Sequence, residues 1–310
     1  MPSTPRAIAY VGVGLMGGPM VRRLLSQGYS VRAFDISLDR LVEAKAAGAV
    51  AAATPAEAIV GADLVALNLP STGAVEEAVF GGNGVASRLS PPQILVDFST
   101  IEVARCRQLA GRLKEMTGCS WLDAPVSGGP MASGEGTLAI MAGGEKSDIA
   151  RLGPLFADLS RNFTHVGPTG SGLIAKMVSQ LIVGCLHVVL AEAAKLAELS
   201  GIDAAGIPAC VAGGHADGEL LRQLYPRIVA RDFRPRAYAR QLVKDMAMVK
   251  QLASASKLSC PMLDQALSLY RLLTDRGYAE ADVAAVIRLY DSEHEPDPSL
   301  NSKTEGTAPC

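Results

Sequence analysis

The sequence predicts an α/β protein in which an N-terminal domain with a mainly parallel, doubly wound sheet is joined to an all-α C-terminal domain by a long interdomain helix. From residue 6 to about residue 165, short apolar runs alternate with helical segments, which is the pattern of a doubly wound sheet. Beyond Gly167 the pattern changes to helical periodicity, which continues to about Tyr290. A length of 310 residues also favours two domains over one compact core.

The domain boundaries follow from this change of pattern. We expect the sheet domain at residues 1–167 and the helical domain at 168–292, and we expect the polar remainder, 293–310, to be a disordered tail. The first helix of the second domain, at about residues 171–200, is apolar on most faces, so we expect it to be buried between domains or subunits. Homo-oligomerisation is therefore expected.

Short apolar runs in the first domain are the strand candidates: residues 7–13, 30–34, 64–69, 94–98 and 120–123. A further run at 137–142 lies between glycines and is expected to add an edge strand. Small and polar residues follow the main runs. In open α/β sheets, ligands bind at this edge, outside the carboxyl ends of the strands.

Charge and cysteine usage exclude several classes of function. The net charge is −2 and the Lys and Arg residues are scattered, so neither a nucleic acid nor an anionic membrane is an expected partner. The six cysteines are widely spaced and form no ligand cluster, which favours reduced thiols and no bound metal.

No membrane attachment is expected either. The most apolar run, residues 181–191, is shorter than the roughly 20 residues that a bilayer crossing needs. Only a few residues precede the first predicted strand, which leaves no room for a secretory signal. A cytoplasmic protein is the expectation.

The first strand candidate runs directly into a glycine-rich segment, Gly12-Val-Gly-Leu-Met-Gly17, which opens a helix. In the G-x-G-x-x-G spacing, the first glycine makes the turn and the second lets backbone amides approach a pyrophosphate. The third lets the helix pack closely on the strand. A lone glycine pattern also occurs in tight packing turns, but here strand, glycines and helix agree on the dinucleotide-binding loop of a Rossmann domain.

Asp35 ends the second strand candidate, about 20 residues beyond the loop, where an acidic side chain binds the ribose hydroxyls of the cofactor. A carboxylate there repels a ribose 2′-phosphate, so NAD is favoured over NADP. Arg32 and Arg40 would weaken this repulsion if they pointed inward, although solvated arginines are the alternative interpretation.

A second glycine-rich segment, Asp123-Ala-Pro-Val-Ser-Gly-Gly129, follows the last main strand candidate. Consecutive small residues can turn successive N–H groups toward one point, with Ser127 as an added donor. Such a concave site suits a carboxylate. The alternative is an ordinary glycine-rich loop.

Lys176 lies near the start of the interdomain helix, on a face that it shares with Ser179, Gln180 and His187. A lysine there is commonly a solvated charge. Beside the positive nicotinamide ring in a cleft, however, its ammonium form would be disfavoured, which suits a general base for an alcohol proton. His187 is interpreted as a core residue.

Together these segments resemble the β-hydroxyacid dehydrogenase family, which includes 3-hydroxyisobutyrate dehydrogenase, tartronate semialdehyde reductase and L-threonate dehydrogenase. The resemblance spans about residues 6–290 and rests on ordered motifs: the two glycine-rich segments, Gly170-Ser-Gly-Leu-Ile-Ala-Lys176, and Lys244-Asp245. By itself, the last pair is equally typical of a surface ion pair.

The resemblance implies a role for each matching residue. Lys176 is implied as the catalytic acid/base, and Ser127, Gly128 and Gly129 as the holders of the substrate carboxylate. The residues implied to bind the cofactor are Gly12, Gly14, Leu15, Met16, Gly17, Asp35, Leu69, Pro70, Thr100 and Lys244.

One departure from the family concerns the substrate. The positions three and four residues after the lysine often carry Asn or His and then Asn or Gln, and both face the substrate; here they are Ser179 and Gln180. The shorter Ser179 enlarges the pocket or admits a water. The expected activity is hydride transfer between NAD and a small 3-hydroxy acid. The alternatives are an imine reductase-like NADP enzyme and a non-catalytic dinucleotide-binding assembly module.

Overall fold

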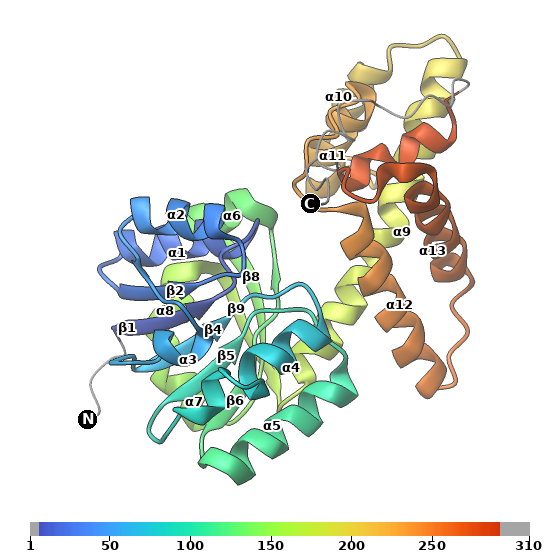
Figure 1. The fold of residues 1–310 in the computed structure, drawn as a ribbon. Coiled ribbons are helices and arrows are strands. Elements are labelled where there is room, and N and C mark those ends of the chain that lie inside the picture. The colour runs from blue at the N-terminus through green and yellow to red at the C-terminus, as the bar shows by residue number, and fades with distance from the viewer. Residues whose placement is uncertain (1–5, 292–310) are drawn as a thin grey trace, which may run out of the picture. The chain divides into compact units, whose positions relative to one another are not determined.

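The computed structural model describes residues 6–291, and the chain divides into two compact units with the boundary after Lys176. The tail expected at residues 293–310 lies outside the described residues. Within the described part, the first unit contains all the strands of the sheet, and the second is built from helices (Figure 1). The predicted α/β fold class is confirmed.

The strands of the first unit form a single sheet within residues 6–291, in the order β3-β2-β1-β4-β5-β6-β8-β7, with β9 paired to β8. The bounds are β1 (Ala7–Val11), β2 (Ser30–Phe34), β3 (Val50–Ala51), β4 (Leu64–Leu67), β5 (Ile94–Asp97), β6 (Ser120–Asp123), β7 (Val126–Ser127), β8 (Leu138–Gly143) and β9 (Ser160–Gly167). The pairs from β3 to β6 are parallel, whereas β8 runs antiparallel to β6 and β7.

The strand order reverses next to β1, because β2 lies on one side of it and β4 on the other. The loops that follow β1, β4 and β5 therefore begin at neighbouring points on the carboxyl edge of the sheet. In open α/β sheets this reversal is the point at which ligands bind.

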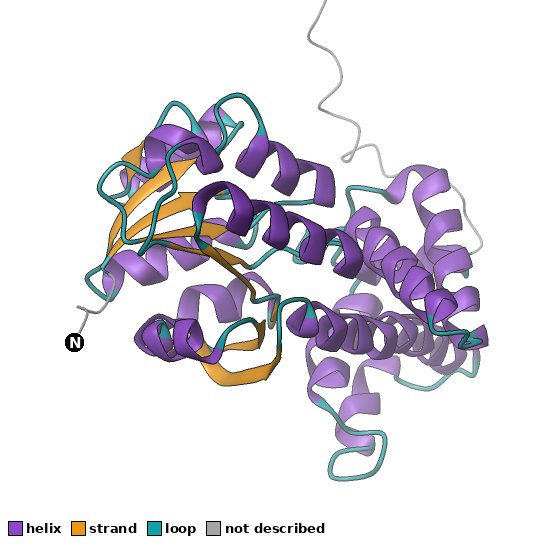
Figure 2. Ribbon diagram, turned by 90° about the horizontal axis from the view of Figure 1, so that it is seen from below, coloured by secondary structure: helices purple, strands orange, loops and turns teal. Residues whose placement is uncertain are grey.

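Helices cover both faces of the sheet, as Figure 2 shows with purple ribbons on either side of the orange strands. On β1, Ile8 and Tyr10 belong to one apolar cluster, and Ala9 and Val11 belong to the other, because successive side chains on a strand point to opposite faces. The helical segments of this unit are α1 (Gly17–Ser26), α2 (Leu38–Ala46), α3 (Pro55–Ala58), α4 (Thr72–Phe80), η1 (Val85–Ser87), α5 (Val103–Thr117), α6 (Gly129–Glu135), α7 (Lys146–Arg151) and α8 (Gly153–Leu159).

Four strands differ from the sequence prediction. β3 was not predicted, because it has only two residues, and both are exposed. The run predicted as an edge strand forms β8, but β8 lies inside the sheet, between β7 and β9. β9 was not predicted, because its side chains alternate only between half-buried and exposed and it contains no apolar run. β7 has only two residues, too few for a periodic signal.

The long helix α9 (Ser171–Leu199) forms as predicted, but it is more apolar than the sequence analysis recognised. By length and composition it could cross a membrane, since an 18-residue window has a mean hydropathy of 2.0; 33% of that window is buried. This is weak evidence, because core helices of soluble proteins pass the same test. Val178, Ile182, Leu186 and Val189 are exposed along α9 in the single chain, and its burial between domains or subunits stays a prediction.

The second unit continues with shorter helical segments: η2 (Ala204–Gly206), α10 (Ile207–Cys210), α11 (Glu219–Val229), α12 (Ala239–Ala255), α13 (Pro261–Leu273), η3 (Thr274–Tyr278) and η4 (Val283–Leu289). Helices α12 and α13 pack against each other, and α13 also packs on η4.

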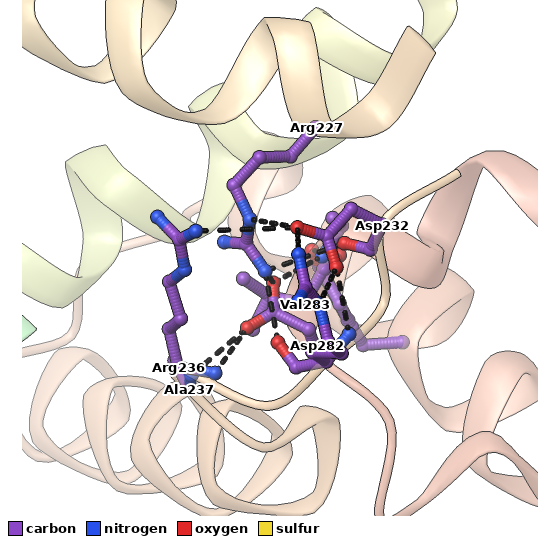
Figure 3. Close-up of polar contacts among 9 residues, drawn as sticks. Arg227, Asp232, Arg236, Ala237, Asp282 and Val283 are labelled. Carbon is purple, nitrogen blue, oxygen red and sulfur yellow. Dashed lines mark hydrogen bonds and ion pairs between the residues drawn. The ribbon is translucent and has the colours of Figure 1, made fainter. Parts of the chain in front are cut away.

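A buried carboxylate organises the end of this unit (Figure 3). Asp282 has no exposed surface and accepts hydrogen bonds from the backbone N–H groups of Arg236, Ala237 and Ala284 at 2.7–3.0 Å. The Arg227 guanidinium lies 3.1 Å from the same carboxylate. Asp282 therefore caps η4 and holds the segment before α12 in place.

Replacing this carboxylate should destabilise the protein strongly. Asp282→Ala removes the acceptor of three backbone N–H groups and one carboxylate partner of the half-buried Arg227, so we expect a loss of about 3–5 kcal/mol in the free energy of unfolding. Urea unfolding followed by circular dichroism measures this loss. Glu280→Ala is the control, since Glu280 forms an exposed ion pair with Arg240 and should change little. Equal losses of stability in the two variants would contradict the structural role proposed for Asp282.

Candidate active site

The glycine loop after β1 has the geometry that its sequence predicts. Gly12 has φ +94°, and a Cβ built on it would lie 2.3 Å from the carbonyl oxygen of Asn68. A Cβ on Gly17 would lie 2.0 Å from the carbonyl oxygen of Gly12. Only glycine, which has no Cβ, fits at positions 12 and 17. A Cβ on Gly14, in contrast, would meet only the Arg40 side chain within 4 Å, so the loop backbone is approachable from that side.

Asp35 joins the end of β2 to this loop. Its side chain is buried, and its two carboxylate oxygens accept hydrogen bonds from the N–H groups of Val13 and Ser37, both at 2.8 Å. The carboxylate is thus held beside the first turn of the loop. Additional lone pairs on both oxygens can accept from a ribose hydroxyl.

The loops after β4 and β5 are tied to each other at the same edge of the sheet. The Leu69 N–H donates to Ser99 Oγ at 2.8 Å, and the Ser99 N–H donates to a carboxylate oxygen of Asp97 at 2.9 Å. The candidate cofactor residues Leu69, Pro70 and Thr100 lie in these two loops.

The arrangement fits a dinucleotide cofactor. Leu15 and Met16 complete the glycine loop and are half-buried, and Met16 is the N-cap of α1. The N–H groups at the start of a helix favour phosphate. A pyrophosphate needs a turn that carries no side chains and the N-terminus of a helix, and a ribose needs an acidic residue at the end of β2. All three are present here.

The second glycine-rich segment lies directly after β6. Ser127 ends the short strand β7 and is half-buried. Gly128 and Gly129 have φ +133° and +74°, a backbone region that other residues rarely adopt. A Cβ on Gly128 would also lie 2.7 Å from that of Ala132. Both glycines are therefore required by backbone conformation.

Asp123, at the end of β6, holds the start of α9. Its carboxylate is 1% exposed and accepts hydrogen bonds from the N–H groups of Gly170 at 2.6 Å and Leu173 at 2.9 Å. Burial raises the pKa of Asp123, and the backbone hydrogen bonds oppose this shift. At Gly172, a Cβ would lie 2.3 Å from the carbonyl oxygen of Met141, so the first turn of α9 packs directly on β8.

Lys176 lies in the second turn of α9 and is only 7% exposed. Its Nζ donates a hydrogen bond to the carbonyl oxygen of Val126 at 2.8 Å. Because Val126 immediately precedes Ser127, the ammonium group and the second glycine-rich segment are neighbours. The burial of Lys176 distinguishes it from a solvated surface lysine.

In the second unit, α9 carries Ser179 and Gln180, both half-buried. The side-chain Nε2 of Gln180 donates to Asp245 Oδ2 at 2.7 Å, and Lys244 Nζ lies 3.1 Å from Asp245 Oδ1. Asp245 is buried. Lys244, Asp245 and Gln180 thus form one polar cluster rather than the isolated surface pair that was the alternative.

Sequence reasoning did not assign roles to Asp123 or Asp245. Asp123 was part of a quoted motif, but only the structure gives its hydrogen bonds to the start of α9. His187 is buried in the helical unit, and burial lowers its pKa to about 4, so it is neutral at neutral pH. This agrees with its interpretation as a core residue, but its buried Nδ1 has no hydrogen-bond partner within residues 6–291, so it is not the satisfied histidine that was expected.

Comparison with known protein families covers both parts of the chain. Residues 7–167 match the family described as the NAD binding domain of 6-phosphogluconate dehydrogenase. Residues 170–290 match the family described as NAD-binding of NADP-dependent 3-hydroxyisobutyrate dehydrogenase.

Individual relatives match over nearly their full length. The chain is 35% identical to the NAD-dependent L-serine dehydrogenase of Pseudomonas aeruginosa over 294 residues, which cover 92% of this chain and 98% of the relative. It is 31% identical to the 2-hydroxy-3-oxopropionate reductase of Escherichia coli, with 91% and 96% covered.

A solved 3-hydroxyisobutyrate dehydrogenase from Salmonella typhimurium has a TM-score of 0.84 at 28% identity, and the match covers 91% of this chain and 99% of that one. The fold, the glycine loop and the matches over the whole chain lead to one conclusion. The chain belongs to the 3-hydroxyisobutyrate dehydrogenase family and is an oxidoreductase, a hydroxyacid dehydrogenase that depends on a pyridine nucleotide.

Proposed function

We propose that the protein transfers a hydride between NAD and a small 3-hydroxy acid, such as 3-hydroxyisobutyrate, glycerate with tartronate semialdehyde as its partner, or a threonate-like acid, with Lys176 as the general acid/base. One observation carries the proposal. Lys176 is buried, and its Nζ lies 2.8 Å from the carbonyl oxygen of Val126, directly before the segment proposed to hold the substrate carboxylate.

Each candidate residue has a role in this proposal. Ser127, Gly128 and Gly129 bind the carboxylate, and Ser179 and Gln180 contact the rest of the substrate. The cofactor residues are Gly12, Gly14, Leu15, Met16, Gly17, Asp35, Leu69, Pro70, Thr100 and Lys244. Domains at 1–167 and 168–292 fit these roles, with the cofactor residues of the sheet in the first.

In the proposed mechanism a side chain of the protein accepts the proton, and the cofactor accepts the hydride. NAD supplies the acceptor carbon for the hydride that leaves the carbinol carbon of the substrate. The Lys176 amine accepts the hydroxyl proton as the C=O bond forms. In the reverse direction the Lys176 ammonium donates that proton, and its charge stabilises the developing alkoxide. The hydrogen bond to Val126 holds Nζ in place for both directions.

The names of the relatives agree with this substrate class. The Pseudomonas relative is named for L-serine and the Escherichia coli relative for 2-hydroxy-3-oxopropionate, and both molecules are three-carbon acids with oxygen at C3. A Mycobacterium tuberculosis 3-hydroxyisobutyrate dehydrogenase solved with L-serine has a TM-score of 0.81 at 27% identity.

For the cofactor, we propose that NAD is preferred to NADP. The Asp35 carboxylate beside the glycine loop would repel a 2′-phosphate. Arg40 weakens this preference: its Nη1 lies 3.0 Å from the point where a Cβ of Gly14 would be. The Arg40 side chain is otherwise exposed, as the alternative of a solvated arginine expects.

The working form is proposed to be a cytoplasmic homodimer or homotetramer. The exposed apolar residues Val178, Ile182 and Val189 along α9 support an interface between subunits.

Replacing the proposed acid/base should lower turnover strongly without preventing cofactor binding. For Lys176→Ala we expect kcat for oxidation of a 3-hydroxy acid to fall by about 100-fold or more. The measurement is the absorbance of reduced nicotinamide with a panel of hydroxy acids. Lys146→Ala, at an exposed lysine of α7, is the control and should retain activity. Near-normal turnover of Lys176→Ala would remove this residue from the mechanism.

The cofactor preference should respond to Arg40. For Arg40→Ala we expect the Kd for NADP to rise by about tenfold, because a charged hydrogen bond is lost, while the Kd for NAD changes less than about threefold. Titration of both cofactors by fluorescence gives the two constants. Arg88→Ala, at an exposed arginine after η1, serves as the control. Equal changes in both constants would show that Arg40 does not read the 2′ position.

A further inference from the structure

The carboxylate of Asp123 is enclosed at the end of β6 by close backbone contacts. Its Oδ1 accepts a hydrogen bond from the Gly170 N–H group at 2.6 Å, and its Oδ2 accepts one from the Leu173 N–H group at 2.9 Å. A Cβ on Gly143 would lie 2.5 Å from Oδ1, and a Cβ on Gly172 would lie 3.0 Å from Oδ2, so side chains at these two positions would crowd the carboxylate. The carboxylate therefore has little freedom to move, and it fixes the two N–H groups from which it accepts.

Both N–H groups lie at the start of α9, and Lys176 follows Leu173 by three residues in the same helix. Backbone hydrogen bonds join consecutive turns of an α-helix, so a shift of the first turn also moves the lysine. Lys176 Nζ in turn donates to the carbonyl oxygen of Val126 at 2.8 Å, and Val126 follows Asp123 by three residues. The contacts form a closed circuit: Asp123 holds the helix, and the helix carries the lysine back to the segment that begins at Asp123. This circuit lies within the first compact unit, which ends at Lys176.

We propose that Asp123 is a positioning residue for the reaction: its carboxylate holds the Lys176 amine beside the segment from Ser127 to Gly129 and thereby sets kcat. The inference rests on the proposed function, in which Lys176 exchanges a proton with the substrate and this segment binds the substrate carboxylate. Asp123 is 1% exposed, and each of its oxygens accepts from a backbone N–H group. Its effect on the reaction is therefore exerted through Lys176 and not by contact with the substrate.

The two acceptor oxygens make this role specific to a carboxylate. An asparagine side chain has nearly the same shape, but one of its two ends is an NH₂ group that only donates. At position 123 that NH₂ group would face the N–H group of Gly170 or of Leu173, and two donors repel each other. The start of α9 would have to shift to relieve this repulsion. A displacement of about 1 Å in a reacting group can lower a rate by about 100-fold.

The first experiment compares Asp123→Asn with a matched control in the full-length protein. For Asp123→Asn we expect kcat for oxidation of a 3-hydroxy acid to fall by at least about tenfold. The Kd for NAD, measured by fluorescence titration, should change by less than about threefold, because the glycine loop after β1 is held by other contacts. An unchanged kcat would overturn the inference.

The control is Asp63→Asn, which makes the same change at the opposite edge of the sheet. Asp63 precedes β4, and its Oδ2 accepts from the N–H groups of Arg6 at 2.8 Å and Ala7 at 2.9 Å, at the start of β1. This carboxylate therefore also joins two distant segments through backbone N–H groups, but it has no connection to α9. Its replacement should leave kcat within about threefold of the wild-type value. A loss equal to that of Asp123→Asn would show that any damage to the sheet unit lowers turnover, and it would overturn the inference.

A double-mutant cycle separates positioning of the lysine from a general structural role. If Asp123 acts through Lys176, then Asp123→Asn should lower the residual kcat of the Lys176→Ala variant by less than about threefold, because no amine remains to be positioned. A purely structural role predicts instead that the two losses multiply. An equal loss from Asp123→Asn in the presence and absence of the lysine would therefore overturn the inference.

The cycle also separates this inference from the proposed function. Near-normal turnover of Lys176→Ala alone would contradict both. A strong loss in Lys176→Ala, with either normal turnover in Asp123→Asn or losses that multiply, would contradict the inference alone. Should Asp123→Asn lose its affinity for NAD through misfolding, the cycle is repeated with Asp123→Glu. That variant keeps the charge and both acceptors but displaces them by one methylene group, and the same outcomes decide.

Discussion

The carboxylate of Asp123 fixes the start of α9 on the sheet, and the position of Lys176 depends on it. Asp123 ends β6 and accepts hydrogen bonds from the N–H groups of Gly170 and Leu173, one turn of helix before Lys176. The same strand leads into Val126, whose carbonyl oxygen accepts from Lys176 Nζ at 2.8 Å. The short segment from Asp123 to Val126 thus positions both the start of α9 and the carbonyl group to which Lys176 donates.

This arrangement has an energetic cost that its hydrogen bonds offset. Burial raises the pKa of Asp123, which shows that the charged carboxylate is disfavoured there. The N–H groups and the positive end of the helix dipole stabilise that charge in return. Lys176 is also buried, with a backbone carbonyl as its partner. Buried charged groups that are held in this way are typical of sites where their chemistry is used.

The sequence predicts the fold well wherever a strong local pattern exists. The short apolar runs at β2 and β6 predict both strands at their observed bounds, and the glycine spacing predicts the turn at Gly12. In contrast, β9 and the interior position of β8 depend on pairing between strands that are distant in sequence. The local hydrophobic pattern of a segment carries no information about such pairing. Within the site, the partners of Asp123 and Asp245 join residues 47 to 65 positions apart, so spacing along the chain cannot reveal them.

The proposed chemistry requires Lys176 to exchange a proton with the substrate while the neighbouring glycine-rich segment holds the substrate carboxylate. The most direct measurement is a crystal structure of the protein with NAD and a 3-hydroxy acid. In that structure Lys176 Nζ should lie about 2.6–3.2 Å from the substrate C3 oxygen, with the carboxylate against the segment from Ser127 to Gly129. A substrate bound with its C3 oxygen beyond hydrogen-bonding reach of Lys176, and with its carboxylate held elsewhere, would contradict it.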